Sequence, residues 1–310
     1  MRIFENVHFD FLSSFGKSYL ISGVLLAIAV VSLVYPGLEA GIDFKGGTEF
    51  TVQTAQPIAP TQARAALADD FGDGVEVKEF GDPNTLLVRT AVGGDAEGLR
   101  ASLLSALGAE FAGARPEVVA TSSVGPRIAS DLKEKAVFLV LGSLVVILLY
   151  IFLRFDWRYA LAAVLTLAHD VVIVLGLFAL FHNVTPFSLQ IDQAIIAALL
   201  TIVGYSINDT VVVFDRIREY ATLFKTEPFA VIANRAVNTT LSRTVLTSGT
   251  TLLTVLVLFL FGGETLKGFA LALLVGIAVG TYSSIFVASP LVVWLRERFA
   301  PARRAVVARA

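Results

Sequence analysis

The sequence predicts an α-helical polytopic membrane protein with six transmembrane helices and an external ferredoxin-like α+β domain between helices 1 and 2. Of the 310 residues, 55% are apolar and only 16% are charged, a balance that excludes an ordinary soluble domain. Six apolar runs are each long enough to cross a bilayer, which takes roughly 20 residues. These runs cover residues 18–36, 136–153, 159–181, 191–214, 244–261 and 268–295.

The first apolar run is expected to be a retained helix and not a cleaved signal peptide. Glu5 and Asp10 precede the run, and Tyr35, Pro36 and Gly37 after it offer no cleavage site made of small residues. The first run is therefore counted as the first of the six helices.

Lysine and arginine residues gather in the loops on one side of the six runs, which predicts the orientation of the chain. The opposite side has none between His182 and Gln190 and only Lys267 after the fifth run. Both termini are therefore expected in the cytoplasm. The expected organisation is an N-terminal segment with helix 1 (1–36), an external domain (37–134), helices 2–6 (135–298) and a basic cytoplasmic tail (299–310).

The external segment alternates between strand-like and helix-like patterns. Strands are expected at 48–55, 75–80, 85–91 and 117–125, with one helix from Pro60 to Phe71, capped by Thr61, and another from Asp95 to about Leu107. This order of strand, helix, strand, strand, helix, strand is ferredoxin-like. Because both helices then cover one face of the sheet, the other face is expected to be free for a partner.

Charge and residue chemistry in the external segment point to binding or leverage and not to catalysis. Residues 37–134 hold 15 acidic and 8 basic residues, a local charge of −7, so the remainder of the chain carries about +5 and a nucleic-acid partner finds no support. No combination of histidine, serine and carboxylate there suggests an enzyme, and no metal site is expected. Cysteine is absent from the whole chain, so the domain does without disulfides.

Asp209 lies inside the fourth apolar run, where an ionisable group costs about 3 kcal/mol and is by default a proton or ion site. The alternative is that Asp209 only reaches interfacial water at the end of its helix. Asp215 and Arg216 mark the water boundary one to two turns later, which favours the ion site. Polar neighbours that belong to the same candidate site are Tyr205, Ser206, Asn208 and Thr210.

A second polar pair, His169 and Asp170, falls near the middle of the third run. It either relays protons or locks helix packing through hydrogen bonds to hydroxyls, and the spacing does not decide between the two. The fifth run supplies hydroxyls on one face, a stripe that indicates helix packing more often than a conduction path. This stripe consists of Thr240, Thr244, Thr247, Thr251 and Thr254.

Arg243, at the entrance of the fifth run, has two interpretations of equal weight. It is either a positive anchor at the headgroups or a counter-ion for Asp209. The sixth run carries a small residue at every fourth place, which predicts a face for close packing with another helix. These small residues are Gly268, Ala272, Gly276, Gly280, Ser284 and Ala288.

Three stretches resemble the signature motifs of the SecF family, whose members pair with SecD in bacterial protein translocation. They are GIDFKGGTEF (41–50), VGYSINDTVVVFDRIRE (203–219) and NTTLSRTVLTSGTT (238–251), in the family's order. The resemblance implies one half of a twelve-helix unit of the resistance-nodulation-division superfamily. It also implies that Asp209 and Arg243 take part in ion coupling. Gly46 and Gly47 would open the external domain as a hinge or as a tight turn.

The resemblance further implies a subunit of the bacterial cytoplasmic (inner) membrane that uses a proton or sodium gradient, and no cofactor, to help draw preproteins outward. The implied partners are SecD, the SecYEG channel, YajC, the translocating unfolded preprotein and membrane lipids. Two alternatives remain open. One is a half-subunit of another ion-driven exporter of the superfamily. Such an exporter is expected to have a second external insertion between later helices, and the loop 182–190 is too short to hold one. The other is a purely structural subunit that stabilises its partner.

Overall fold

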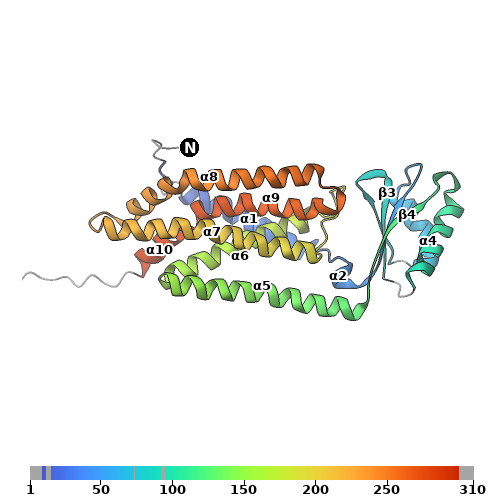
Figure 1. Cartoon of the computed structure of the whole chain (residues 1–310), viewed down its shortest axis with the longest axis horizontal. Helices are drawn as coiled ribbons and strands as arrows, with labels where there is room; N and C mark the ends of the chain where they lie inside the picture. The colour runs from blue at the N-terminus through green and yellow to red at the C-terminus, as the bar shows by residue number, and fades with distance from the viewer. Residues whose placement is uncertain (1–8, 12–14, 73, 92–94, 300–310) are drawn as a thin grey trace, which may run out of the picture.

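A computed structural model describes residues 9–11, 15–72, 74–91 and 95–299 (Figure 1). A bundle of long helices makes up one part, and a small sheet with two helices stands at one end of the bundle. The predicted fold class is confirmed. The expected basic tail lies outside the described residues, except for Phe299.

Within the described ranges, six helices are long and apolar enough to cross a membrane, as predicted. The last of them changes its winding, because a π-helical segment (η2, Ser284–Ala288) separates α9 from α10. The six are α1 (Phe15–Val34), α5 (Pro126–Arg154), α6 (Trp157–Phe181), α7 (Gln193–Leu223), α8 (Phe229–Phe261) and the continuous α9 (Glu264–Ser283), η2 and α10 (Ser289–Arg298).

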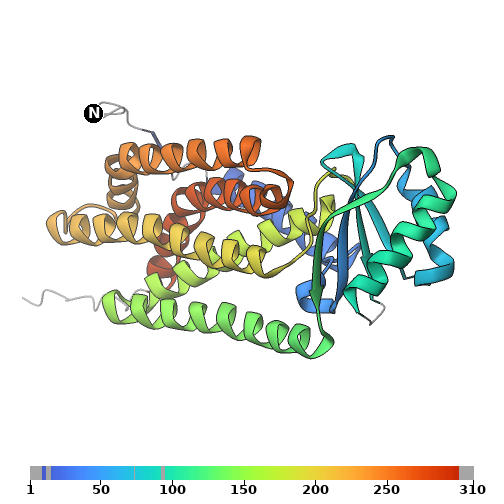
Figure 2. The same cartoon turned by 45° about the vertical axis from the view of Figure 1, so that its right-hand side comes forward.

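The helices α6, α7 and α9 form the centre of the bundle, while α5 and α8 lie at its periphery (Figure 2). About half of the most apolar part of α6 and of the last helix is buried, against 6% for α5 and 17% for α8. In α1 the buried side chains are small, and a Cβ on Gly176 of α6 would lie 2.3 Å from Cβ of Ala29. The peripheral helices therefore present apolar surface outward.

The small residues of α9 lie against α7. A Cβ on Gly276 would lie 2.4 Å from the side chain of Ile202, and one on Gly280 would lie 3.0 Å from Cβ of Ser206. Near the start of α9, a Cβ on Gly268 would lie 2.7 Å from the carbonyl oxygen of Ser188. These helices approach so closely that any side chain at Gly276 would displace its neighbour.

The sheet has four antiparallel strands in the order β2-β3-β1-β4, with the connections of a ferredoxin-like fold. Thr61 does not cap α3, because this helix begins at Pro60 with Ala59 at its N-cap; Asp95 stands at the N-cap of α4 without a side-chain hydrogen bond. The elements are β1 (Gly47–Gln53), α3 (Pro60–Phe71), β2 (Glu76–Phe80), β3 (Asp82–Thr90), α4 (Ala96–Glu110), η1 (Ala112–Ala114) and β4 (Glu117–Val124).

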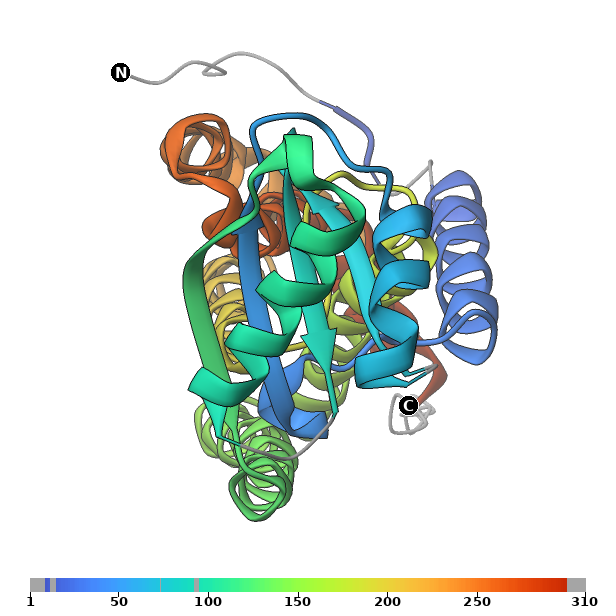
Figure 3. The same cartoon turned by 90° about the vertical axis from the view of Figure 1, so that its right-hand side faces the viewer.

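Helices α3 and α4 cover one face of this sheet (Figure 3), where Phe50 and Val88 are fully buried in its core. The expectation of a free opposite face is wrong at its centre. Leu87 and Arg89 point to that face and are only 8% and 7% exposed, because the face lies over the end of the bundle. The backbone N–H of Gly81 donates to the carbonyl of Pro186 across 3.3 Å.

Gly46 and Gly47 connect the short helix α2 (Ile42–Lys45) to β1 in a tight, closely packed turn. Both have left-handed φ values, 76° and 123°. A Cβ on Gly47 would lie 2.4 Å from the carbonyl oxygen of Thr90, so only glycine fits there. The same segment is held to the bundle, because Ala40 and Ile191 form a parallel bridge.

Candidate functional site

Asp209 lies inside the bundle and is only 6% exposed. Helix α7 carries it, and two hydroxyls from other elements bind its carboxylate. Thr244 of α8 donates to Oδ1 across 2.9 Å, and Ser284 at the start of η2 donates to Oδ2 across 3.2 Å. The carboxylate is therefore held by neutral hydroxyl groups from two neighbouring elements.

Arg243 makes no direct contact with this carboxylate, although its charge acts on Asp209 at longer range. Its residue is exposed, and the described residues show no ion pair within 4.0 Å between its guanidinium and Asp209. One residue is about 100° of rotation on an α-helix, so Thr244, and not Arg243, faces Asp209. The Thr247 hydroxyl lies 2.9 Å from the carbonyl oxygen of Arg243 and 3.1 Å from that of Thr244.

His169 and Asp170, both in α6, form a second buried polar group of the bundle. Nδ1 of His169 lies 2.9 Å from Oδ1 of Asp170, and their side chains are 5% and 1% exposed. Oδ2 of Asp170 accepts hydrogen bonds from Ser206 of α7 across 2.6 Å and from Ser283 of α9 across 2.8 Å. Three donors from three helices therefore surround this carboxylate.

The remaining polar residues predicted around Asp209 have separate positions. The Tyr205 hydroxyl donates to Oγ1 of Thr251 across 3.4 Å, and Asn208 is exposed on the other side of α7. Thr210 is buried, and its hydroxyl has no hydrogen-bond partner among the described atoms. Of these residues, only Ser206 takes part in binding a buried carboxylate.

The threonines of α8 differ in the same way. Thr240, Thr251 and Thr254 donate to carbonyls of their own helix, as Thr247 does. Thr244 alone in the predicted stripe bonds a buried carboxylate. The stripe is therefore mostly local bonding, with one member in the site.

Two site residues were not recognised as carboxylate ligands from the sequence. No sequence pattern singles out Ser283, and the ladder of small residues marks Ser284 only as a packing residue. The available signal was two consecutive serines inside an apolar run, next to the ladder of small residues. The π-helical winding that begins at Ser284 has no sequence pattern of its own, although such segments are frequent at functional sites.

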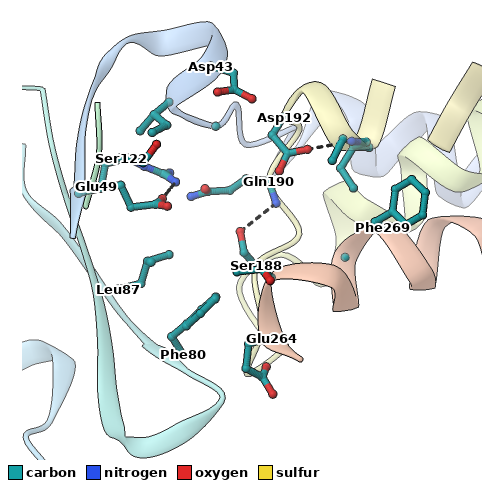
Figure 4. A pocket seen from close by; sticks show the side chains of 17 residues that line it. Asp43, Glu49, Phe80, Leu87, Ser122, Ser188, Gln190, Asp192, Glu264 and Phe269 are labelled. Carbon is teal, nitrogen blue, oxygen red and sulfur yellow. Dashed lines mark hydrogen bonds and ion pairs between the residues drawn. The ribbon is translucent and has the colours of Figure 1, made fainter. Parts of the chain in front are cut away.

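A cavity of about 220 Å³ lies between the sheet and the end of the bundle (Figure 4). Beside it, two carboxylates cap α7: Asp43 accepts from the backbone N–H of Gln193 across 2.9 Å, and Asp192 accepts from that of Ile195 across 2.8 Å. Burial, together with the nearby charge of Asp43, raises the pKa of Asp192. Across the described ranges, no group of three or more His, Cys, Asp and Glu side chains is arranged to hold a metal ion.

Glu39 ties the sheet to the bundle at the same place. Its carboxylate accepts from Lys78 of β2 across 2.6 Å and from Gln190 of the bundle loop across 2.8 Å. Burial acts to raise the pKa of Glu39, but the hydrogen bonds from Lys78 and Gln190 outweigh it and lower that pKa. The charged form of Glu39 is thus favoured by both bonds.

Two protein-family models match the chain. "Protein export membrane protein SecD/SecF, C-terminal" matches residues 106–298, and "SecD/SecF GG Motif" matches residues 36–58. The chain is 55% identical to the protein translocase subunit SecF of Rhodothermus marinus over 100% of both chains. It is 43% identical to that of Vibrio alginolyticus, over 88% of this chain and 85% of the relative.

Solved structures of SecDF resemble the chain as well. The crystal structure of SecDF from Thermus thermophilus, described as a translocon-associated membrane protein, gives a TM-score of 0.85 at 40% identity over 94% of this chain. The crystal structure of SecDF in a super-membrane-facing form gives 0.68 at the same identity and coverage. In both comparisons this chain spans only 39% of the length of the other chain.

Proposed function

The chain belongs to the SecD/SecF family of protein export membrane proteins, and we propose that it is the ion-coupling membrane subunit of an assembly with SecD. In this proposal a proton or sodium gradient across the bacterial inner membrane drives a late step of preprotein translocation. As a multi-pass membrane protein, the chain would place its termini in the cytoplasm and its sheet domain outside.

The buried carboxylate of Asp209 is the observation that supports this proposal most. A carboxylate inside an apolar bundle is costly, so by default it indicates a functional site such as an ion-binding site. Its ligands are the hydroxyls of Thr244 and Ser284, and a hydroxyl can either donate to an ionised carboxylate or accept from a protonated one. Asp209 can therefore gain and lose a proton without losing its ligands.

Arg243 would complete the cycle in a second arrangement of the bundle. A rotation of α8 by about 100° exchanges Thr244 for Arg243 at the carboxylate. The two SecDF structures differ from each other in shape, since they match this chain with TM-scores of 0.85 and 0.68 at equal identity. One charge moved through 100 mV is worth about 2.3 kcal/mol, which is enough to bias such an equilibrium.

The partners follow from the surfaces. Helices α5 and α8 present apolar side chains outward, and a SecD half would pack on this periphery to complete a twelve-helix unit. The sheet domain is fixed to the bundle through Glu39 and Gly81, so a shift in the bundle reaches the sheet. The SecYEG channel, YajC and the unfolded preprotein are the further proposed partners.

Asp209→Asn tests the proposal, because it keeps volume and hydrogen bonding but removes titration. Inverted membrane vesicles with the SecD partner should retain the gradient-independent part of export and lose the gradient-driven part. Asp215→Asn is the matched control: the Asp215 carboxylate lies on the same helix, is 54% exposed and pairs with Arg154 across 2.9 Å. Normal gradient-driven export by the Asp209 variant at normal protein levels would rule the proposal out.

A further inference from the structure

Two adjacent serines connect the two buried carboxylates of the bundle. Ser283 donates to Oδ2 of Asp170 across 2.8 Å, and the next residue, Ser284, donates to Oδ2 of Asp209 across 3.2 Å. A second connection runs along α7, where Ser206, three residues before Asp209, binds Asp170 across 2.6 Å. The two carboxylates are thus held by consecutive residues of one helix, and the backbone of Ser283 and Ser284 joins their two sets of hydrogen bonds.

Each of the two serines has an alternative acceptor. Oγ of Ser283 also lies 3.1 Å from the carbonyl oxygen of Gly280, and Oγ of Ser284 lies 3.0 Å from that of Thr281. A serine hydroxyl carries a single hydrogen, so it donates either to its carboxylate or to its own helix. Each hydroxyl can therefore respond to the charge of the carboxylate beside it.

The helix departs from regular α-helical winding at this point. The π-helical segment starts at Ser284, and the hydroxyl of Ser289 donates to the carbonyl of Ser284 across 3.0 Å. Wide turns of this kind occur mostly as single insertions in α-helices, often at functional sites. A change in the bonding of Ser284 therefore acts where the regular winding is already broken.

His169 supplies a place for a proton in this network. With Nδ1–H donated to Asp170, Nε2 is left as an acceptor, and it is buried with no hydrogen-bond partner among the described protein atoms. Asp170 accepts three donors, which suit an ionised carboxylate. A proton on Nε2 changes the net charge of the pair from −1 to zero, a gain inside an apolar bundle.

We infer that the His169–Asp170 pair is a second proton-binding site, linked to Asp209 through the alternating hydroxyls of Ser283 and Ser284. Protonation at one site changes the proton affinity of the other, and the effect is reciprocal because it is an equilibrium linkage. This inference deepens the proposed function, on which its role in transport depends. The binding equilibrium itself needs neither a gradient nor a client.

Few other titratable groups face the pair. Of the helices packed on α6, α7 brings Asp209 and α9 brings Tyr282, whose hydroxyl donates to the carbonyl of Ser18 across 3.0 Å. The buried face of α1 offers serines, which do not titrate in this range. The charged residues of α5 and α10 lie towards the ends of these helices, at 127–135 and 154 and at 296–298.

The test uses the full chain labelled with ¹⁵N-histidine in lipid nanodiscs, where NMR reports the protonation of each imidazole. The sequence has only three histidines, His8, His169 and His182, so His169→Asn and His182→Asn assign the signals. We expect the His169 signal to change with pH as the imidazole takes up a proton. Asp209→Asn removes a nearby carboxylate and should lower the midpoint by about half a pH unit or more, roughly threefold in proton affinity.

The serine link has its own variants. Ser284→Ala and Ser283→Ala should each reduce the shift that Asp209→Asn causes to less than about half of its original size. Ser248→Ala is the matched control, because the Ser248 hydroxyl is buried, accepts from Thr281 across 2.8 Å and touches neither carboxylate. It should leave the shift unchanged, and the His182 signal in every variant shows that the fold is intact.

Three results would overturn the inference. They are a His169 that does not titrate, a midpoint that is unchanged by Asp209→Asn, and a shift that survives both serine variants. The measurement is also independent of transport. Normal gradient-driven export by Asp209→Asn would contradict the proposed function and leave the titration linkage intact. Loss of gradient-driven export without any change in the His169 midpoint would contradict this inference and leave the proposed function intact.

Discussion

Thr244 of α8 donates its hydroxyl hydrogen to Asp209 of α7 across 2.9 Å, and so joins the helices that carry the stretches 203–219 and 238–251. The bond is fully enclosed, since Thr244 is 0% exposed. Because water cannot replace this hydrogen bond inside the bundle, replacing a single atom of Thr244 should change the stability of the site.

Thr244→Val should weaken both stability and gradient-driven export, because it keeps the shape of threonine and removes the donor. A hydrogen bond to a charged group contributes about 1.5–3 kcal/mol, so the loss should be measurable as a lower melting temperature. Thr244→Ser should restore most of both properties. Thr254→Val is the control, since that hydroxyl donates within α8, across 3.0 Å to the carbonyl of Thr250. Equal effects at both positions would contradict a special role for Thr244.

Asp209 and Arg243 should act independently in stability but jointly in export. In the structure they form no direct ion pair and interact only through their charges at longer range, so the thermal effects of Asp209→Asn and Arg243→Gln should be close to additive, within about 0.5 kcal/mol. If the two residues meet in another arrangement, the double variant should export hardly less than Asp209→Asn alone. Additive losses in export would mean that the residues never pair.

Arg243→Lys separates a pairing role from an anchoring role. A lysine serves equally well as a positive anchor at the headgroups, whereas a semi-buried pair with a carboxylate depends on the planar guanidinium. We therefore expect reduced gradient-driven export at normal protein levels. An export rate equal to that of the unmodified chain would leave Arg243 as an anchor only.

Gly276→Leu should destabilise the bundle by about 1–3 kcal/mol or more through overpacking. A Cβ at Gly276 would lie 2.4 Å from Ile202, and a leucine adds further atoms on the same line. Gly249→Leu in α8 is the matched control, because nothing lies within 4 Å of a Cβ there. Melting temperatures that drop equally for both would show that helix propensity, and not contact with α7, causes the loss.

Asp192→Asn should flatten the pH dependence of stability. Burial and Asp43 raise the folded-state pKa of Asp192 above its ordinary value. At a pH between the ordinary pKa and the folded-state pKa, the folded chain therefore binds more protons than the unfolded chain. Stability at this group therefore falls as pH rises through the folded-state pKa. Asparagine caps a helix about as well as aspartate, so the variant should match or exceed the parent at neutral pH. A lower melting temperature at pH 7 would contradict this sign.

The number of spanning helices could be predicted because it depends only on composition over the thickness of a bilayer. The ends of these helices could not. Helix α8 begins at Phe229, well before the apolar run at 244, because its first turns are polar on one side and pack with Ala233 and Ala236 on the other. Hydropathy detects the part in lipid and misses a helix that continues into water.

The candidate site divides in the same way. A buried carboxylate is visible in sequence, so Asp209, His169 and Asp170 could be recognised as polar residues in apolar runs. Their ligands depend on helix rotation, and an error of one residue turns a side chain by about 100°. This is why Thr244 and the serine pair, and not Arg243, surround the carboxylates in the structure.

The chain from Glu39 to Asp43 is tied to the bundle by its backbone. The N–H of Ile191 donates to the carbonyl of Glu39 across 2.7 Å, and the N–H of Gly41 donates back to Ile191 across 2.8 Å. A chimaera that exchanges the outer domain between relatives should therefore place its first junction after Gly47 and not at the end of α1. A splice at the earlier point would import a foreign cap for α7 together with the new sheet.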